Sequence, residues 1–446
     1  MAVKFYPSQI GSDLVTPLSY TASPGKLFFQ DLWLVFVNLR FVPGIFIPLT
    51  STSSGVLDEL YPSPGNLLNL ALHAVLFFLQ LCFILSVPIW FIMPVWVVAT
   101  GFTMFWMFNY LLCLILNGSA SVSTCESAPE YAQRKEEFAH ERWLYMNGVC
   151  TGHHWLKGSV DRLALTFGRP VLGIHNRTKG LIFDLFECLI QRTLNYATAD
   201  IRTSYRILKG TLYEPDVTRV MFILHSQGSI EGSMIIDWLL AEIPQDLLQK
   251  LEVYTFGSAA NHFNNPHLQI ASQNNALAHP SLRATSLTRT VTTLFTNSNT
   301  PSGHMFVQHY LDTMFPLSKS SQRLLNGTGI KNDENTMRAN WDRERVDEDC
   351  GFMTSSVEGK GRVAPEDKLG REDWEVSCVG ESEADSGIAP QISVKGAKTN
   401  GSQKKKWTNF PVEGTIVTNG AFGTSGYKVK NLSRLWLYRD GRSPMN

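Results

Sequence analysis

The sequence has no Asp, Glu, Lys or Arg from Leu60 to Cys125. Within this stretch, residues 67–85 and 89–116 are each close to the roughly 20 apolar residues that cross a hydrocarbon core. A soluble protein would need a very large core to bury so long an uncharged run. We therefore expect two transmembrane helices joined by a tight turn near residues 86–88. The flanking charges favour a cytosolic main domain only slightly, so the chain is predicted to be a multi-pass integral membrane protein.

The chain also lacks net charge and closely spaced cysteine pairs. It has 39 Lys and Arg against 39 Asp and Glu, which does not favour nucleic acid as a partner. Its seven cysteines form no CxxC pair and no metal-ligand spacing, so we interpret them as reduced thiols. Residues 1–25 lack the pattern of a signal peptide. We expect no cofactor and no metal ion.

Composition changes along the chain predict four parts. They are an N-terminal interfacial segment (1–60), the two membrane helices (61–118), a folded domain that is possibly truncated (119–317) and a mostly disordered C-terminal tail (318–446).

Both terminal parts have a distinctive composition. Residues 27–49 are apolar and aromatic, but Asp31 and Arg40 interrupt them, which favours an interfacial or re-entrant segment over a third span. The tail has low hydrophobicity and mixed charge, too little apolar area to offset chain entropy. Within it, residues 427–438 form an aromatic and basic patch suited to folding back on the domain or the membrane surface.

The folded part shows strand-like runs that alternate with segments of helical periodicity, which is typical of an α/β domain with a mainly parallel sheet flanked by helices. The expected strands are residues 141–148, 169–176, 220–224 and 251–256, and the expected helices are residues 157–167, 180–197, 201–209 and 230–241.

The third of these strands carries the strongest local motif. The apolar run from Arg219 stops at His225-Ser226-Gln227-Gly228, and helical spacing begins at Ile230. A serine at such a strand–turn–helix corner is placed like the nucleophile of a serine hydrolase. Chemistry in parallel sheets gathers beyond the carboxyl ends of the strands, where Asn147-Gly148 and Gly257-Ser258 also lie.

The order of four motifs carries a resemblance to a known family. These are Asn-Gly-Val-Cys-Thr-Gly-His-His-Trp, Arg-Pro-Val-Leu-Gly-Ile-His-Asn, His-Ser-Gln-Gly and Gly-His-Met-Phe-Val-Gln-His-Tyr-Leu. From about Trp143 to Pro316 the chain resembles the α/β-hydrolase superfamily, and within it lipase-like serine hydrolases of the kind found in membrane-anchored fungal proteins. Leu224 stands where that superfamily usually has a small residue, whereas Gly228 meets the matching requirement after the serine.

The resemblance implies roles for particular residues. Ser226 would be the nucleophile, and a histidine farther along the chain would be its base. His304 is our first candidate for the base, since it follows the strand-like residues 291–296 and precedes the helix-like residues 305–315. His309, inside that helix, is the alternative base, and we expect His225 to face the sheet or brace the corner.

Backbone amides would form the oxyanion hole. One is the N–H of Gln227, directly after the nucleophile. The other comes from the turn Gly148-Val149-Cys150, and we select Val149, although the sequence does not say which amide points inward. We interpret Cys150 as a packed thiol.

The acid of a catalytic triad is missing from its expected place, because no Asp or Glu occurs between Glu252 and Asp312. Three explanations stay open: the base acts unassisted or with a carbonyl or Asn partner, an acid arrives from elsewhere with Asp184 as a weak candidate, or the core is truncated and inactive.

We therefore expect a membrane-anchored esterase-like or lipase-like hydrolase. Its partners would be the lipid bilayer and an ester of a lipid or other apolar acyl substrate. The alternative is a catalytically inactive hydrolase-like membrane protein with a binding or scaffolding role.

Overall fold

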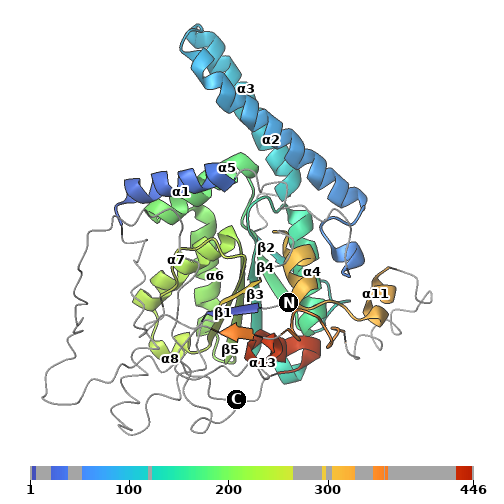
Figure 1. The fold of residues 1–446 in the computed structure, drawn as a ribbon. Coiled ribbons are helices and arrows are strands. Elements are labelled where there is room, and N and C mark those ends of the chain that lie inside the picture. Colours follow the sequence, from blue (N-terminus) through green and yellow to red (C-terminus); the bar gives the residue numbers. More distant parts are fainter. Residues whose placement is uncertain are drawn as a thin grey trace, which may run out of the picture.

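A mixed five-stranded sheet is the centre of the domain (Figure 1). The computed structural model describes residues 3–6, 22–38, 53–118, 123–264, 294–297, 304–326, 345–355, 357–359 and 428–443. In sheet order the strands are β2 (Thr124–Glu126), β4 (Val171–Ile174), β3 (Glu141–Met146), β5 (Arg219–His225) and β6 (Leu251–Phe256). Only β2 runs antiparallel to its neighbour, β4. The α/β class and all four expected strands are confirmed.

Helices cover both faces of this sheet. Because successive side chains of a strand point to opposite faces, Tyr145 and Ile223 pack with α4 (His153–Phe167), whereas Met146 and Leu224 pack on the other face. The remaining helices of the domain are α5 (Leu181–Leu194), α6 (Ala199–Tyr213), α7 (Gln227–Glu242) and α8 (Gln245–Leu248). Residues of α6 and α7 form the core on the face of the sheet that carries Met146 and Leu224.

The chain reverses its direction across the sheet between β3 and β5. From β3 it proceeds outward to β4 and then returns to β5 and β6 on the other side of β3. Ligand sites of open α/β sheets lie beyond the carboxyl ends of the strands at such a switch point. Asn147-Gly148 after β3 and Ser226 after β5 occupy this position.

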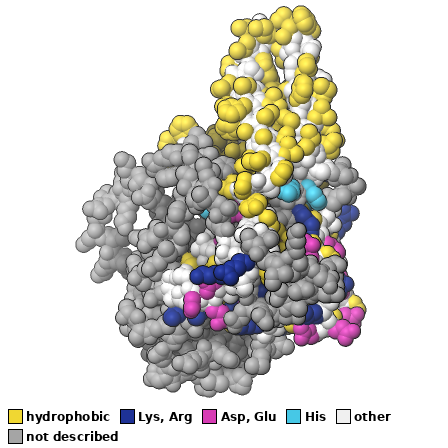
Figure 2. Space-filling model, turned by 90° about the vertical axis from the view of Figure 1, so that its right-hand side faces the viewer, with side chains coloured by type: hydrophobic (Ala, Val, Ile, Leu, Met, Phe, Trp, Pro, Cys, Tyr) yellow, Lys and Arg dark blue, Asp and Glu magenta, His cyan; other side chains and the backbone are white. Residues whose placement is uncertain are grey.

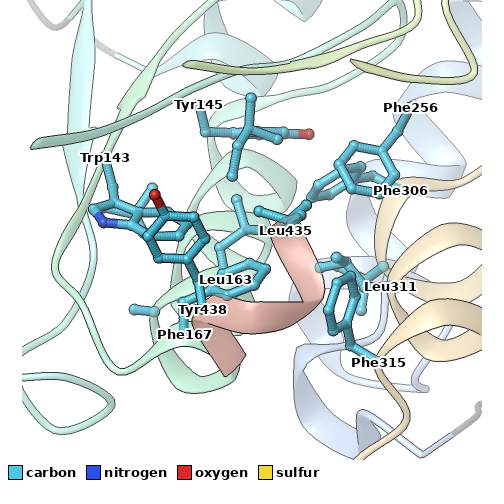
Figure 3. Packing of buried hydrophobic residues seen from close by; sticks show 14 of the residues in the cluster. Trp143, Tyr145, Leu163, Phe167, Phe256, Phe306, Leu311, Phe315, Leu435 and Tyr438 are labelled. Atoms are coloured by element: carbon cyan, nitrogen blue, oxygen red, sulfur yellow. The ribbon is translucent and has the colours of Figure 1, made fainter. Parts of the chain in front are cut away.

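A described segment near the C-terminus, beyond the predicted boundary at residue 317, packs in the core of the domain. Leu435, Trp436 and Tyr438 of the helical segment η8 (Leu435–Gly441) are buried among Trp143, Phe167 and Phe315 (Figure 3). This segment overlaps the aromatic and basic patch at residues 427–438, and the structure places it on the domain, one of the two surfaces that the sequence suggested. The other described parts of the tail are α11 (Lys319–Leu325), residues 345–355, β8 (Val357–Gly359) and α13 (Val429–Leu432).

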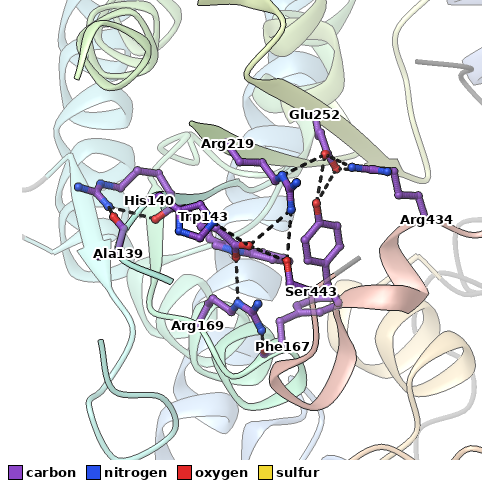
Figure 4. A network of polar contacts seen from close by, with 12 residues as sticks. Ala139, His140, Trp143, Phe167, Arg169, Arg219, Glu252, Arg434 and Ser443 are labelled. Atoms are coloured by element: carbon purple, nitrogen blue, oxygen red, sulfur yellow. Dashed lines mark hydrogen bonds and ion pairs between the residues drawn. The ribbon is translucent and has the colours of Figure 1, made fainter. Parts of the chain in front are cut away.

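Ion pairs hold this C-terminal segment against the amino ends of the strands (Figure 4). Arg434 donates to the carboxylate of Glu252 on β6 at 2.8 Å, and Tyr438 Oη lies 3.1 Å from both of its oxygens. Glu141, at the start of β3, pairs with the buried Arg169 at 3.0 Å. The network lies at the end of the sheet opposite to Ser226 and is structural.

Two long apolar helices form a hairpin that projects from the domain (Figure 1). They are α2 (Pro64–Trp90) and α3 (Val95–Asn117), and both are long and apolar enough to cross a membrane. The turn lies at residues 91–94 rather than 86–88, because α2 continues through Pro88. Helix α1 (Pro24–Asn38) packs beside α5.

A second, small sheet pairs β1 (Val3–Tyr6) with β7 (Leu294–Asn297) and β8 (Val357–Gly359). The strand expected at residues 291–296 is therefore observed as β7, but outside the main sheet. After His304 the chain continues as the π-helical turn η6 (Phe306–Leu311) and α10 (Asp312–Met314). The polar stretch from residue 271 to 290 lies outside the described residues.

Candidate active site

Ser226 occupies a strained corner between β5 and α7. Its φ of 52° and ψ of −116° are outside the regions that L-residues favour, and such a conformation costs roughly 1–3 kcal/mol. The backbone holds it on both sides: the Ser226 amide donates to Phe256 O at 3.0 Å, and Ser226 O accepts from the Ser229 amide at 3.0 Å. A serine hydroxyl is thus fixed at the carboxyl edge of the sheet.

Two glycines of α7 make this close corner possible. A Cβ on Gly228 would lie 2.8 Å from the carbonyl oxygens of Met146 and Asn147, so only glycine lets the helix approach β3. A Cβ on Gly232 would lie 2.3 Å from Leu224 Cδ1. Gly232 therefore accommodates the large side chain that stands two residues before the serine.

The structure brings His304 to Ser226, with Nε2 2.8 Å from the serine Oγ. His304 directly precedes the segment that leads into η6. The carboxylate of Glu59 fixes the start of η6 by accepting hydrogen bonds from the amides of Val307 (2.7 Å) and Gln308 (3.1 Å). Burial, and secondarily the nearby His309, lower the pKa of His304 to about 4. At neutral pH its imidazole is therefore uncharged and free to accept a proton.

The other ring nitrogen of His304 meets a tyrosine rather than a carboxylate. Nδ1 lies 2.9 Å from Tyr310 Oη. Burial raises the pKa of Tyr310 to about 12, so the phenol is neutral at physiological pH. Gly257, at the end of β6 with φ 54°, leaves space for it, because a Cβ there would lie 2.2 Å from Tyr310 Oη and 2.7 Å from His304 Cε1. The sequence offered no signal that would have identified Tyr310.

Asp184, in the first turn of α5, points its carboxylate at the turn after β3 rather than at the histidine. Its carboxylate accepts from the amides of Cys150 (2.9 Å) and Lys179 (2.7 Å) and from the hydroxyl of Thr178 (2.6 Å). Burial raises its pKa to about 6, against the effect of these hydrogen bonds. The prediction of Asp184 as the acid is corrected: its oxygens are occupied in bracing the turn that contains Cys150.

This turn presses against the nucleophile. A Cβ on Gly148 would lie 2.6 Å from Ser226 Cβ, and Cys150 has a positive φ of 55°. Since the Cys150 amide is bonded to Asp184, the amide preceding it, that of Val149, is the candidate donor of the turn. Gln227 is the first residue of α7, where backbone amides have no intrahelical acceptor. Desolvation raises the pKa of the Cys150 thiol well above its ordinary value, which does not favour a thiolate nucleophile.

A buried row of amide side chains fixes the two candidate donors relative to each other. Asn147 donates to Gly148 O at 2.9 Å and to Asn176 O at 2.8 Å, and Asn176 in turn donates to Gln227 Oε1 at 2.9 Å. Gln227 Nε2 then donates to Gln191 at 3.0 Å. Asn147 lies at a strand end, as the sequence predicts, but no sequence pattern indicates this row.

His225 and His309, the other two histidines named in the sequence analysis, each have a structural partner. His225 Nε2 donates to the carbonyl of His304 at 3.1 Å and so braces the segment that carries the base. His309 Nδ1 accepts from the Met305 amide at 3.0 Å, inside its own helical turn.

No protein-family model, curated protein or solved structure matches this chain. The site therefore has to be judged on its own geometry.

Within the described residues, no group of three or more His, Cys, Asp or Glu side chains is arranged to hold a metal ion. Ser226 is itself only 6% exposed, so neighbouring residues cover it and a substrate must pass them to reach the hydroxyl.

The hairpin is connected to the turn that Asp184 braces. Asn117, the last residue of α3, donates to Thr178 O at 2.8 Å and accepts from the Thr178 amide at 3.0 Å. The Thr178 hydroxyl then donates to Asp184, which holds the Cys150 amide. One hydrogen-bonded path thus runs from the end of the apolar hairpin to the candidate oxyanion turn.

Proposed function

We propose that the protein is a serine hydrolase that cleaves an ester of a lipid or another apolar acyl compound at a membrane. The observation that carries this proposal is the pair formed by Ser226 and His304. A serine on a strained strand–helix corner, 2.8 Å from an uncharged imidazole nitrogen, is the arrangement that nucleophilic catalysis requires.

The chemistry would proceed in two steps. Ser226 Oγ attacks the ester carbonyl while His304 Nε2 takes its proton, and the same imidazole returns that proton to the departing alkoxide. Water then hydrolyses the acyl-serine with His304 again as the base. These two steps require the neutral ring of His304 to carry its proton on Nδ1. This N–H then donates a hydrogen bond to Tyr310 Oη.

The developing oxyanion would be stabilised by the amides of Gln227 and Val149. Backbone donors suit this role because they are oriented before charge develops, and one such donor is typically worth about 10²- to 10³-fold in rate. Asp184 and Asn147 are positioning residues here, because they hold the backbone of the turn and do not contact the reacting atoms.

The substrate class is inferred from the position of the site. The hairpin reaches the same edge of the sheet as Ser226, through Asn117 and Thr178, and a Cβ on Gly152 would lie 2.8 Å from Leu116 O of α3. An active serine this close to an apolar anchor favours an apolar ester.

One observation favours the alternative of a non-catalytic binding protein. Tyr310 stands where a carboxylate would stabilise the imidazolium, and a neutral phenol does so less strongly than a charge. Under this alternative Ser226 would not react with acyl esters.

Hydrolysis by variants of the full-length protein in detergent distinguishes the two. Ser226→Ala should abolish hydrolysis of short and long acyl esters that the parent protein cleaves. Ser258→Ala is the matched control, since Ser258 is an exposed serine at the end of the neighbouring strand. Activity that survives Ser226→Ala removes the catalytic assignment, and a parent protein without activity on any ester supports the binding protein.

A further inference from the structure

The apolar hairpin is exposed for most of its length. Phe91 (87% exposed), Ile92 (80%) and Val95 (84%) form its tip, and none of its residues is charged. Figure 2 shows hydrophobic side chains along the whole visible length of the hairpin, interspersed with backbone and other uncharged atoms, while Lys, Arg, Asp and Glu are visible only below its base. Such a surface requires a partner that is itself apolar.

The hairpin is attached to the domain as far as Gln80, about midway along α2. Gln80 is fully buried and donates to Lys179 O (2.6 Å) and Asn109 (2.9 Å), and it accepts from the Ile182 amide (3.2 Å). Lys179 Nζ also pairs with Glu187 at 2.6 Å, and the Lys179 side chain is 52% exposed. An exposed ion pair does not lie in hydrocarbon, so the hydrocarbon can begin only beyond this level.

The part beyond Gln80 is short. Residues 81–90 rise about 15 Å at the pitch of an α-helix. On α3, Phe105 and Trp106 still contact Phe183 of α5, so the free stretch from residue 95 to residue 105 also rises about 15 Å. The hydrocarbon core of a bilayer is about 30 Å thick. The free part of the hairpin therefore reaches only to about the middle of a bilayer.

A second apolar surface lies at the base of the hairpin. Helix α1 packs on α5 with Asp31 turned toward Arg192 of α5, at 3.5 Å. On α1 the exposed side chains include Phe29 (70%), Trp33 (63%) and Phe36 (65%). A helix with aromatic residues on its outer face, an exposed lysine (Lys26) near its start and its carboxylate turned inward is suited to the headgroup boundary of a membrane.

We propose that the hairpin enters a single leaflet of a membrane without crossing it, while α1 lies along the surface of that leaflet. Both chain ends of the hairpin then remain on the side of the domain, with the turn at residues 91–94 near the bilayer centre. This inference does not depend on the proposed chemistry.

The depth of two positions along α2 tests this proposal. Cys82, which is exposed, lies two residues beyond Gln80 and can be labelled in the parent protein with a thiol-reactive fluorophore. The second position is Ile92→Cys in a Cys82→Ser background. Full-length protein is reconstituted in phosphatidylcholine vesicles that carry a nitroxide either near the headgroup or near the end of the acyl chain.

The single-leaflet arrangement predicts that the shallow nitroxide quenches the probe at Cys82 most strongly and that the deep nitroxide quenches the probe at Ile92→Cys most strongly. A spanning hairpin, with α2 centred in the bilayer, predicts the reverse order and would overturn the proposal. An Ile92→Cys probe that only an aqueous quencher reaches would show that the hairpin is not inserted, with the same consequence.

Two further positions complete the experiment. Trp33→Cys should be quenched by the shallow nitroxide, and a probe there that neither nitroxide affects removes α1 from the membrane surface. Tyr213→Cys, on an exposed part of α6, is the matched control and should respond only to the aqueous quencher. Ile92, Trp33 and Tyr213 are all at least half exposed, so these substitutions do not alter the core.

Discussion

Replacing Tyr310 by Phe tests the role of the neutral phenol at the candidate base. The substitution removes one oxygen, 2.9 Å from His304 Nδ1, and leaves the packing of the ring against Phe256 and His225. A buried N–H that loses its acceptor costs about 1–3 kcal/mol. If this cost falls on the imidazolium-like transition state, kcat should decrease about 5- to 160-fold, since about 1.36 kcal/mol corresponds to a factor of ten.

The assay is steady-state hydrolysis of a short acyl ester, in which kcat and KM are separated. We expect KM to change little, because Tyr310 contacts the base rather than the space above Ser226. Tyr254→Phe is the matched control: it removes a hydroxyl that donates to Glu252, on the same strand that ends at Gly257, and should leave kcat unchanged. The reasoning is refuted by a Tyr310→Phe protein with the parent kcat, or by equal losses in both variants.

The remaining predictions concern pH, packing and the oxyanion turn. Because burial lowers the pKa of His304 to about 4, the base stays unprotonated well below neutrality, and kcat/KM should remain level to about pH 5 rather than fall near the ordinary value of about 6.5; a midpoint near 6.5 would contradict this. Gly232→Ala should reduce the free energy of unfolding by about 1–3 kcal/mol in chemical denaturation, and Leu224→Ala in the same chain should recover part of that loss; strictly additive effects would show that the two do not compete for space. Asp184→Asn places a donor against the Cys150 amide and should lower kcat about 10- to 100-fold with KM nearly constant, whereas an unchanged kcat would show that the turn does not depend on this carboxylate.

Local sequence patterns predicted the elements that are fixed by local physics. The strand, corner and helix around Ser226 follow from an apolar run that ends at a glycine-containing turn, and these elements are observed at the expected positions. The meeting of His304 with Ser226 was inferred from a resemblance and from chain order, and the two side chains do lie 2.8 Å apart.

Features that depend on tertiary packing were not predictable. Asp184 was selected because it is an acid, but only the folded backbone shows that its oxygens face the amides of Cys150 and Lys179. Tyr310 lies beside His304 Nδ1 only because of the path that the chain takes in η6. Similarly, the large side chain of Leu224 fits because Gly232, eight positions later on a different element, has no Cβ. The patch at residues 427–438 was expected to fold back on the domain or the membrane surface, but only the folded chain shows that Tyr438 packs in the core.

Mapping a covalent adduct tests the central claim most directly. The full-length protein in detergent is treated with a fluorophosphonate, digested and analysed by mass spectrometry, beside the Ser226→Ala and His304→Ala variants. We expect a single adduct on Ser226 in the parent protein, none at that position in Ser226→Ala, and strongly slowed labelling in His304→Ala, since the hydroxyl is then without its base. A parent protein that remains unlabelled, or an adduct at any other residue, would contradict it.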